Sequence, residues 1–172
     1  MKHRVLRYND CAQYCDDLFQ CFKDNPQILD EESIDYFESL EKSVNYVSDL
    51  IDSPDSMVVG IFDDEEEFLY GIIIYDQMRF SLDGNSAQLH IATSKDIWGK
   101  DFLELYKDMI AITVFHVLYC MIPAKCRATI GFVKSLGFEK TGYIPKAIPY
   151  RNRDGKIKMY DELIYTLVKN ES

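Results

Sequence analysis

The chain has 172 residues, of which 47% are hydrophobic and 13% aromatic, so it is long and apolar enough to bury a core. This composition excludes a disordered chain. No apolar run reaches the roughly 18 residues that a membrane-spanning helix needs, and the charged N-terminus lacks the apolar segment of a signal peptide. We therefore expect a single cytoplasmic domain over residues 1–172 that makes no membrane contact.

The net charge of the chain is −10, and it is spread unevenly. Met1 to Glu67 contains 18 acidic and 5 basic residues, a net charge of −13, whereas Phe68 to Ser172 contains 11 acidic and 14 basic residues, a net charge of +3. Because the chain is acidic overall, no nucleic acid is expected as a partner. The basic surplus between Lys125 and Lys158 suits either a small anionic ligand or simply a soluble surface.

The first third of the chain is predicted to be mainly helical. Lys2 to Tyr8 has the pattern of a short strand, and Asp10 is a suitable N-cap for a helix that runs to about Phe22. Apolar residues at three- and four-residue spacing predict a second helix from about Glu31 to Ile51.

Strand patterns dominate the middle of the chain. Met57 to Phe62 and Phe68 to Met78 are expected to form a hairpin whose tip is the acidic run Asp63 to Glu67. That tip is interpreted as a solvated loop rather than a metal site. Ser86 to Thr93 follows as a further strand.

The last third alternates helices with strands. A helix is expected from near Trp98, then a strand from about Val117 to Ile122, and a second helix from about Lys125 to Leu136. Phe138 to Ala147 and Lys158 to Val168 are the last two predicted strands. Gly137 stands where the second helix ends, and it allows the left-handed backbone that commonly terminates a helix.

The five cysteines are expected to be reduced thiols. Cys11 and Cys15 are spaced as metal ligands on a helix can be, but no second Cys or His pair with suitable spacing accompanies them. Buried thiols that pack as small hydrophobic side chains are the preferred interpretation, and no metal is expected.

The element order and the block CRATIGFVKSLGFEKTG, from Cys126 to Gly142, resemble the GCN5-related N-acetyltransferases (GNAT). The block is similar to N-R-A-S-I-x-x-x-x-K-L-G-F-x-x-x-G of members like the ribosomal-protein acetyltransferases, and with Ile122 and Pro123 before it, to phage-encoded members. The resemblance implies an α/β (α+β) GNAT-like fold, with a central mixed, mostly antiparallel sheet of about seven strands flanked by about four helices.

The resemblance also implies acetyl-CoA as the cofactor. In the family's arrangement, Ser86 to Thr93 is the cofactor strand, and the pyrophosphate lies at the N-terminus of the following helix, where free N–H groups favour anions. The residues implied in cofactor binding are Ile91, Ala92, Thr93, Gly99, Lys100, Cys126, Arg127 and Thr129.

The sequence departs from the family at its pyrophosphate loop. Aligned on Gly99, the motif Q/R-x-x-G-x-G/A falls on Trp98, Asp101 and Leu103, and none of these matches. Asp101 brings a carboxylate to a place where an anion should bind, although Lys95 and Lys100 offset part of its charge.

Two other expected side chains differ. Cys126 replaces the asparagine that opens the block, and Val133 replaces a tyrosine that many members use as a general acid. Cys126 would act as a nucleophile only with a base beside it.

His90 is the candidate catalytic base, because it lies on the predicted cofactor strand and its ordinary pKa is close to neutral. A half-buried structural histidine is the alternative at this position. His116 shows no obvious partner in the sequence. Trp98 is interpreted either as a lid over the cofactor or as a packing residue.

Two functions follow from these features. The first is an acyl-CoA-dependent N-acetyltransferase that acts on a small-molecule or protein amine, and the acidic N-terminal half favours a cationic acceptor. The alternative is a catalytically inactive GNAT-fold interaction module, or a phage structural component in a host cell or virion, that has lost acetyl-CoA binding and acts through a protein partner. Apolar positions near the last two strands would allow a homodimer.

Overall fold

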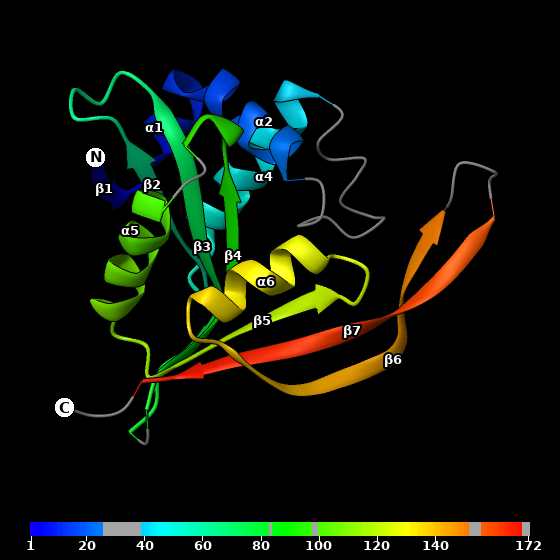
Figure 1. Cartoon of the computed structure of the whole chain (residues 1–172). Coiled ribbons are helices and arrows are strands. Elements are labelled where there is room, and N and C mark those ends of the chain that lie inside the picture. The colour runs from blue at the N-terminus through cyan, green and yellow to red at the C-terminus, as the bar shows by residue number, and fades with distance from the viewer. Residues whose placement is uncertain (26–38, 83, 98–99, 152–155, 170–172) are drawn as a thin grey trace. The chain divides into compact units, whose positions relative to one another are not determined.

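The computed structural model describes residues 1–25, 39–82, 84–97, 100–151 and 156–169 (Figure 1). Its seven strands form one mixed, mostly antiparallel sheet in the order β1-β2-β3-β4-β5-β7-β6. The strands are β1 (Lys2–Val5), β2 (Met57–Phe62), β3 (Leu69–Arg79), β4 (Ser86–Thr93), β5 (Val117–Pro123), β6 (Glu139–Arg151) and β7 (Ile157–Val168). The α-helices in the described residues are α1 (Tyr8–Gln13), α2 (Cys15–Asp24), α4 (Leu40–Asp52), α5 (Lys100–Ala111) and α6 (Arg127–Ser135), and a short 3₁₀ turn, η2 (Lys95–Ile97), follows β4.

The chain divides into two compact units. Unit 1 contains residues 1–79 and 87–99, and unit 2 contains residues 80–86 and 100–172. The expectation of a single domain over the chain remains a prediction.

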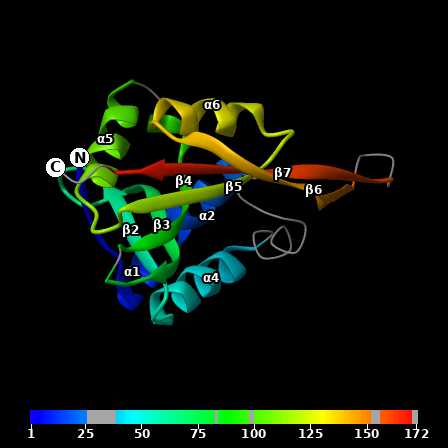
Figure 2. The ribbon, with the colours of Figure 1, turned by 90° about the horizontal axis from the view of Figure 1, so that it is seen from below.

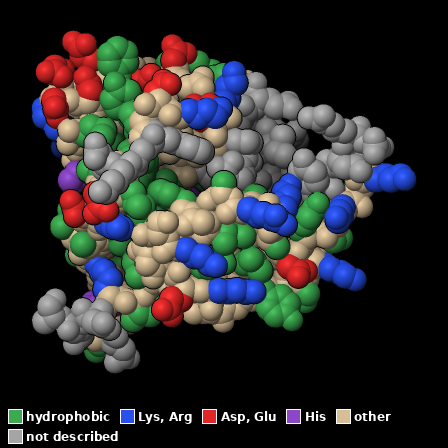
Figure 3. Space-filling view, viewed as in Figure 1, with side chains coloured by type: hydrophobic (Ala, Val, Ile, Leu, Met, Phe, Trp, Pro, Cys, Tyr) green, Lys and Arg blue, Asp and Glu red, His purple; other side chains and the backbone are tan. Residues whose placement is uncertain are grey.

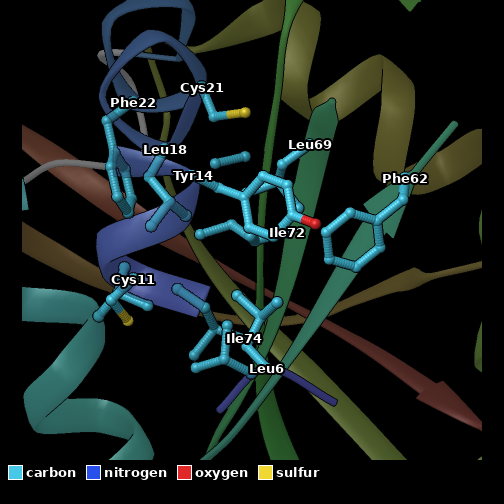
Figure 4. Packing of buried hydrophobic residues seen from close by; sticks show 13 residues of the cluster. Leu6, Cys11, Tyr14, Leu18, Cys21, Phe22, Phe62, Leu69, Ile72 and Ile74 are labelled. Atoms are coloured by element: carbon cyan, nitrogen blue, oxygen red, sulfur yellow. The ribbon is translucent and has the colours of Figure 1, made fainter. Parts of the chain in front are cut away.

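In unit 1, helices α1, α2 and α4 cover one face of the strands (Figure 2). Side chains from α1 and α2 point toward β2 and β3 and make a shared core, in which Leu18 and Phe22 are fully buried (Figure 4). Burying a side chain of this size stabilises the fold by about 1.5–3 kcal/mol. The other members of this core are Leu6, Cys11, Tyr14, Cys21, Val47, Val58, Phe62, Leu69, Ile72, Ile74 and Ala92.

The predicted first helix is in fact two helices. Tyr14 leaves the helical conformation, with φ −111° and ψ 29°, and separates α1 from α2. Its ring packs 5.1 Å from that of Phe62, and its hydroxyl donates to the carbonyl of Glu66 at 2.7 Å. These tertiary contacts outweigh the continuous helical pattern of the sequence.

Asp10 was expected as the N-cap, and this expectation is wrong. The N-cap is Arg7, and the Asp10 carboxylate, from the third helical position, accepts the Arg7 N–H at 2.6 Å. The same carboxylate accepts two hydrogen bonds from Arg4, at 2.7 and 2.9 Å. Asp10 therefore fastens β1 to the start of α1.

In unit 2, β7 pairs with β5 on one side and with β6 on the other, antiparallel in both cases. Helices α5 and α6 contact each other through Tyr106 and Phe132, whose ring centroids lie 5.8 Å apart. The predicted turn at the end of α6 is confirmed: Gly137 has φ +95°, and Phe138 beyond it is buried. No helix in the described part of the chain is long and apolar enough to cross a membrane.

Candidate functional site

His90 lies on β4 in unit 1 and is half-buried. Ala92, two residues further along the strand, belongs to the core beneath α1, α2 and α4. Side chains two residues apart on a strand share a face, so His90 is on the face of β4 that the helices of unit 1 cover. An imidazole in this position remains partly accessible, as a general base must be.

The end of β4 is tied to the end of α2. The Thr93 carbonyl accepts a hydrogen bond from the side-chain amide of Asn25, which is buried. The next N–H, of Ser94, donates to the carbonyl of Tyr70 at 2.8 Å. Of the three residues expected to offer backbone contacts to the cofactor, Thr93 therefore already uses its carbonyl within the protein.

Asp24, the last residue of α2, binds Lys95 at the start of η2. The Asp24 carboxylate accepts from the Lys95 N–H at 3.1 Å and from its ammonium at 2.7 Å. The Asp24 side chain is 8% exposed and that of Lys95 63%. Burial opposes ionisation of Asp24, but the hydrogen bonds from Lys95 outweigh it and hold the pKa of the carboxyl below its ordinary value.

The backbone after β4 satisfies its own donors. Beyond the N–H groups of Ser94 and Lys95, that of Asp96 donates to the Ser94 hydroxyl at 3.3 Å, and that of Ile97 to the Ser94 carbonyl at 3.5 Å. These four consecutive N–H groups are engaged within the chain. An anion bound at this loop would therefore need hydrogen-bond donors from Trp98 onward.

The central part of the expected pyrophosphate loop lies outside the residues that the structure describes. Trp98 and Gly99 are not among the described residues, and for Lys100 and Asp101 only the backbone, at the start of α5, is described. The roles expected of these side chains remain predictions.

The second group of expected cofactor residues is at the start of α6, in unit 2. Cys126 is the N-cap, and its side chain makes no capping hydrogen bond. Arg127 is exposed, Thr129 is partly buried, and the first turn has no acidic residue. Uncapped N–H groups and a cation at a helix N-terminus suit an anion.

Cys126 is not activated as a nucleophile. Burial raises the pKa of its thiol, and the charge of Lys125 offsets only part of that effect. Burial likewise raises the pKa of Cys21 and of Cys120 to about 12. Since the thiolate is the reactive form, these three thiols are inert near neutral pH.

Cys11, like Cys21, is buried in the core of unit 1, so both thiols pack there as small hydrophobic groups. Among the described residues, no three His, Cys, Asp or Glu side chains gather as metal ligands do.

His116 has a partner, contrary to the expectation from the sequence. Its Nδ1 accepts the N–H of Asn85 at 3.1 Å, and its backbone N–H donates to the Asn85 carbonyl at 2.9 Å. His116 therefore holds the turn before β4 and has a structural role.

The structure thus brings the predicted residues into two groups. His90, Ile91, Ala92 and Thr93 lie together on β4 in unit 1, and Cys126, Arg127 and Thr129 lie together at the start of α6 in unit 2. The contacts that Asp24 and Asn25 make at the end of β4 were not predicted from the sequence. A signal was present, because an acidic residue at a helix C-terminus opposes the helix dipole and therefore points to a compensating partner elsewhere.

Comparisons with solved structures give the class of fold. The spermidine N-acetyltransferase of Vibrio cholerae, in complex with CoA and spermine, matches with a TM-score of 0.70 and 15% identity over 97% of this chain and 94% of that one. The ribosomal-protein-S5-alanine acetyltransferase of Vibrio fischeri matches with a TM-score of 0.69 and 13% identity, over 96% and 91%. The ribosomal-protein-alanine N-acetyltransferase of Brucella melitensis matches with a TM-score of 0.64 and 18% identity, over 98% and 100%.

The chain has the GNAT fold. No protein-family model and no curated protein sequence matches it. The similarity is therefore one of structure, and at these identities it establishes the fold alone.

Proposed function

We propose that the chain is an acyl-CoA-dependent N-acetyltransferase that transfers an acetyl group to a primary amine. The observation that carries this proposal is the half-buried His90 on β4, the strand that GNAT chemistry places beside the reacting thioester. The nearly full-length fold match to N-acetyltransferases supports it.

The start of α6 fits an anionic cofactor. Arg127 is exposed there, no acidic residue stands in the first turn, and no side chain caps the helix. In this proposal Cys126, Arg127 and Thr129 contact the cofactor on that side, and the backbone of Ile91, Ala92 and Thr93 does so along β4. Gly99 and Lys100 would hold the pyrophosphate. When bound, acetyl-CoA supplies an acetyl group activated as a thioester.

His90 acts as the general base. Its neutral imidazole takes a proton from the acceptor ammonium, directly or through one water, so that the nitrogen lone pair becomes free to attack. Such a base contributes typically 10²–10⁴-fold to the rate. The net charge of −13 over Met1 to Glu67 favours a cationic acceptor, either a polyamine or the N-terminus of a basic protein.

The enzyme is tested by following release of the CoA thiol from acetyl-CoA, with spermidine and an alanine-initiated peptide as acceptors. We expect turnover with at least one amine, and we expect His90→Gln to reduce it by about 10²–10⁴-fold. His3→Gln, at an exposed histidine on β1, is the matched control and should leave the rate unchanged. Equal rates for His90→Gln and the unaltered protein would remove His90 from the mechanism. Absence of thiol release from the folded protein over a wide amine panel would overturn the enzyme itself.

A non-catalytic module that acts through a protein partner is the second candidate. It is favoured by the engagement of Lys95 with Asp24 and of the N–H groups from Ser94 to Ile97 within the chain. It also accounts for Trp98, Asp101 and Leu103 in the loop motif. This candidate predicts a folded protein that binds neither acetyl-CoA nor CoA.

A further inference from the structure

Strands β6 and β7 continue beyond the rest of the sheet as a two-stranded ribbon. β7 pairs with β5 only from Glu162 to Val168, whereas its pairing with β6 extends to Ile157 (Figure 1). Among the described strands, residues 148–151 and 157–160, hereafter the ribbon, thus pair only with each other. An isolated two-stranded ribbon is marginally stable in water, so a surface that covers it would stabilise it.

The ribbon exposes apolar side chains among lysines. Ile157 is 59% exposed and Met159 43%, and Lys156 and Lys158 beside them are exposed as well. The adjoining part of β6 adds Tyr143, which is 59% exposed. In Figure 3, Lys and Arg side chains gather over this part of unit 2. Lys156 and Lys158 alternate with Ile157 and Met159, so the lysines project from one face of the strand and the apolar pair from the other. The face with the lysines is suited to an acidic partner.

A partner would contact the ribbon through side chains rather than as a strand added to the sheet. β6 is the last strand in the sheet order, so no other described strand pairs with its outer edge. Pro145 and Pro149 remove two N–H groups from it, and the register shifts between Ile144 and Ile148. Prolines and bulges at an edge disfavour pairing with an added strand.

The chain itself carries a complementary surface, the turn between β2 and β3. Glu65 and Glu67 are exposed on this turn, and neither forms an ion pair within the described part of the chain. Phe68 is 52% exposed, and its ring stacks on Tyr70 at 6.5 Å. Figure 3 shows Asp and Glu side chains gathered over this part of unit 1.

The acidic turn is also held in a fixed shape. The Asp63 carboxylate accepts the Phe68 N–H at 3.0 Å, and Glu66 bonds Arg4 at 3.0 Å and, through its carbonyl, the Tyr14 hydroxyl at 2.7 Å. Pre-organisation reduces the entropy lost on binding.

We propose that the ribbon binds the β2–β3 turn of a second copy of this chain. Lys158 of the ribbon and Lys156 beside it face Glu65 and Glu67 of the turn. Two ribbons do not pair with each other, because their lysines repel. The contact joins two different surfaces, so it builds assemblies larger than a dimer unless a ring closes. A turn on a ribbon buries little area, so the contact is weak and depends on salt.

Sedimentation velocity of the purified full chain tests this proposal. The sedimentation coefficient should rise with protein concentration in about 50 mM salt and should fall to that of a monomer in about 500 mM salt. Charge reversal at either surface, with Lys156→Glu plus Lys158→Glu or with Glu65→Lys plus Glu67→Lys, should weaken association by roughly tenfold or more. Lys107→Glu plus Lys134→Glu changes the net charge equally outside the ribbon and is the matched control for the first variant.

The decisive sample is an equimolar mixture of the two charge-reversed variants. One variant then carries acidic charge on both surfaces and the other basic charge, so each repels itself while the two complement each other. We expect the mixture to associate at concentrations where each variant alone is a monomer. A mixture that stays monomeric, or an unaltered protein that is monomeric at every concentration in low salt, would overturn the proposal. Circular dichroism of each variant confirms that it is folded.

Discussion

The carboxylate of Asp24 binds both the backbone N–H and the side-chain ammonium of Lys95, and so joins the end of α2 to the turn that follows β4. These residues are 71 positions apart in the chain. The contact lies directly after the strand that carries His90, and it therefore fixes the backbone that the proposed chemistry depends on.

Asp24→Asn should lower the free energy of unfolding by about 1–3 kcal/mol, because a buried acceptor of several hydrogen bonds loses its charge. Lys95→Met should lower the free energy of unfolding less than Asp24→Asn does, because the Lys95 side chain is exposed and its backbone N–H still donates to Asp24. Urea unfolding of the two variants and of the double variant measures the coupling. If both single substitutions lowered the free energy of unfolding equally, the hydrogen bond from the Lys95 backbone N–H to Asp24 would not contribute as expected.

Asp10→Asn should destabilise the protein by about 1–3 kcal/mol at neutral pH, because it weakens the hydrogen bonds from Arg4 and Arg7. The hydrogen bond from Arg4 holds the pKa of Asp10 below its ordinary value. Because the pKa of Asp10 is lowered in the native state, the ionised carboxylate stabilises the fold above about pH 4. This stabilisation is lost as the pH falls through the native pKa.

The advantage of the unaltered protein over Asp10→Asn should therefore shrink in acid, and urea unfolding at neutral and at acid pH measures it. Asp64→Asn is the control, because Asp64 also forms an ion pair but is 74% exposed. Its removal should change stability much less than Asp10→Asn does, because water and salt screen an exposed ion pair. If Asp10→Asn lowered the free energy of unfolding by the same amount at both pH values, ionisation of Asp10 would not be the cause.

Cys126→Asn should stabilise α6 by about 0.5–1 kcal/mol, because asparagine is a favoured N-cap and the cysteine makes no capping hydrogen bond. Thermal unfolding measures the change, and Cys126→Ala, which cannot cap, is the control. If asparagine and alanine gave the same melting temperature, the cap would not be the origin of the effect.

Two glycine-to-alanine substitutions should have opposite effects. A Cβ on Gly131, inside α6, would meet no atom within 4 Å, so Gly131→Ala should stabilise the helix by about 0.5–1 kcal/mol. Gly137 has φ +95°, so Gly137→Ala should destabilise by roughly 1–2 kcal/mol. Both changes add the same methyl group, and thermal unfolding compares them directly. The same sign for both would contradict the geometry of this helix end.

Local rules were sufficient to predict much of the fold. β2 and β4 lie where the hydrophobic patterns placed them, and Gly137 and Phe138 behave as a helix stop followed by a core residue, because glycine alone adopts a left-handed backbone without strain. The split at Tyr14 was not predictable in this way, because its cause is a contact with Phe62 and Glu66, far away in the sequence.

The site was less predictable than the fold. The position of His90 on a strand followed from alternation, but its burial depends on the helices that cover that face. The hydrogen bonds of Asp24 with Lys95, of Asn25 with Thr93 and of His116 with Asn85 join distant segments, and no periodicity in the sequence encodes them.

Calorimetric titration of acetyl-CoA into the purified protein, with free CoA as a second titrant, tests the central claim most directly. The proposed acetyltransferase predicts saturable binding with a dissociation constant on the order of micromolar, and weaker binding to Arg127→Met. No detectable heat with either titrant, from protein that unfolds cooperatively on heating, would contradict the enzyme and would favour the module that acts through a protein partner.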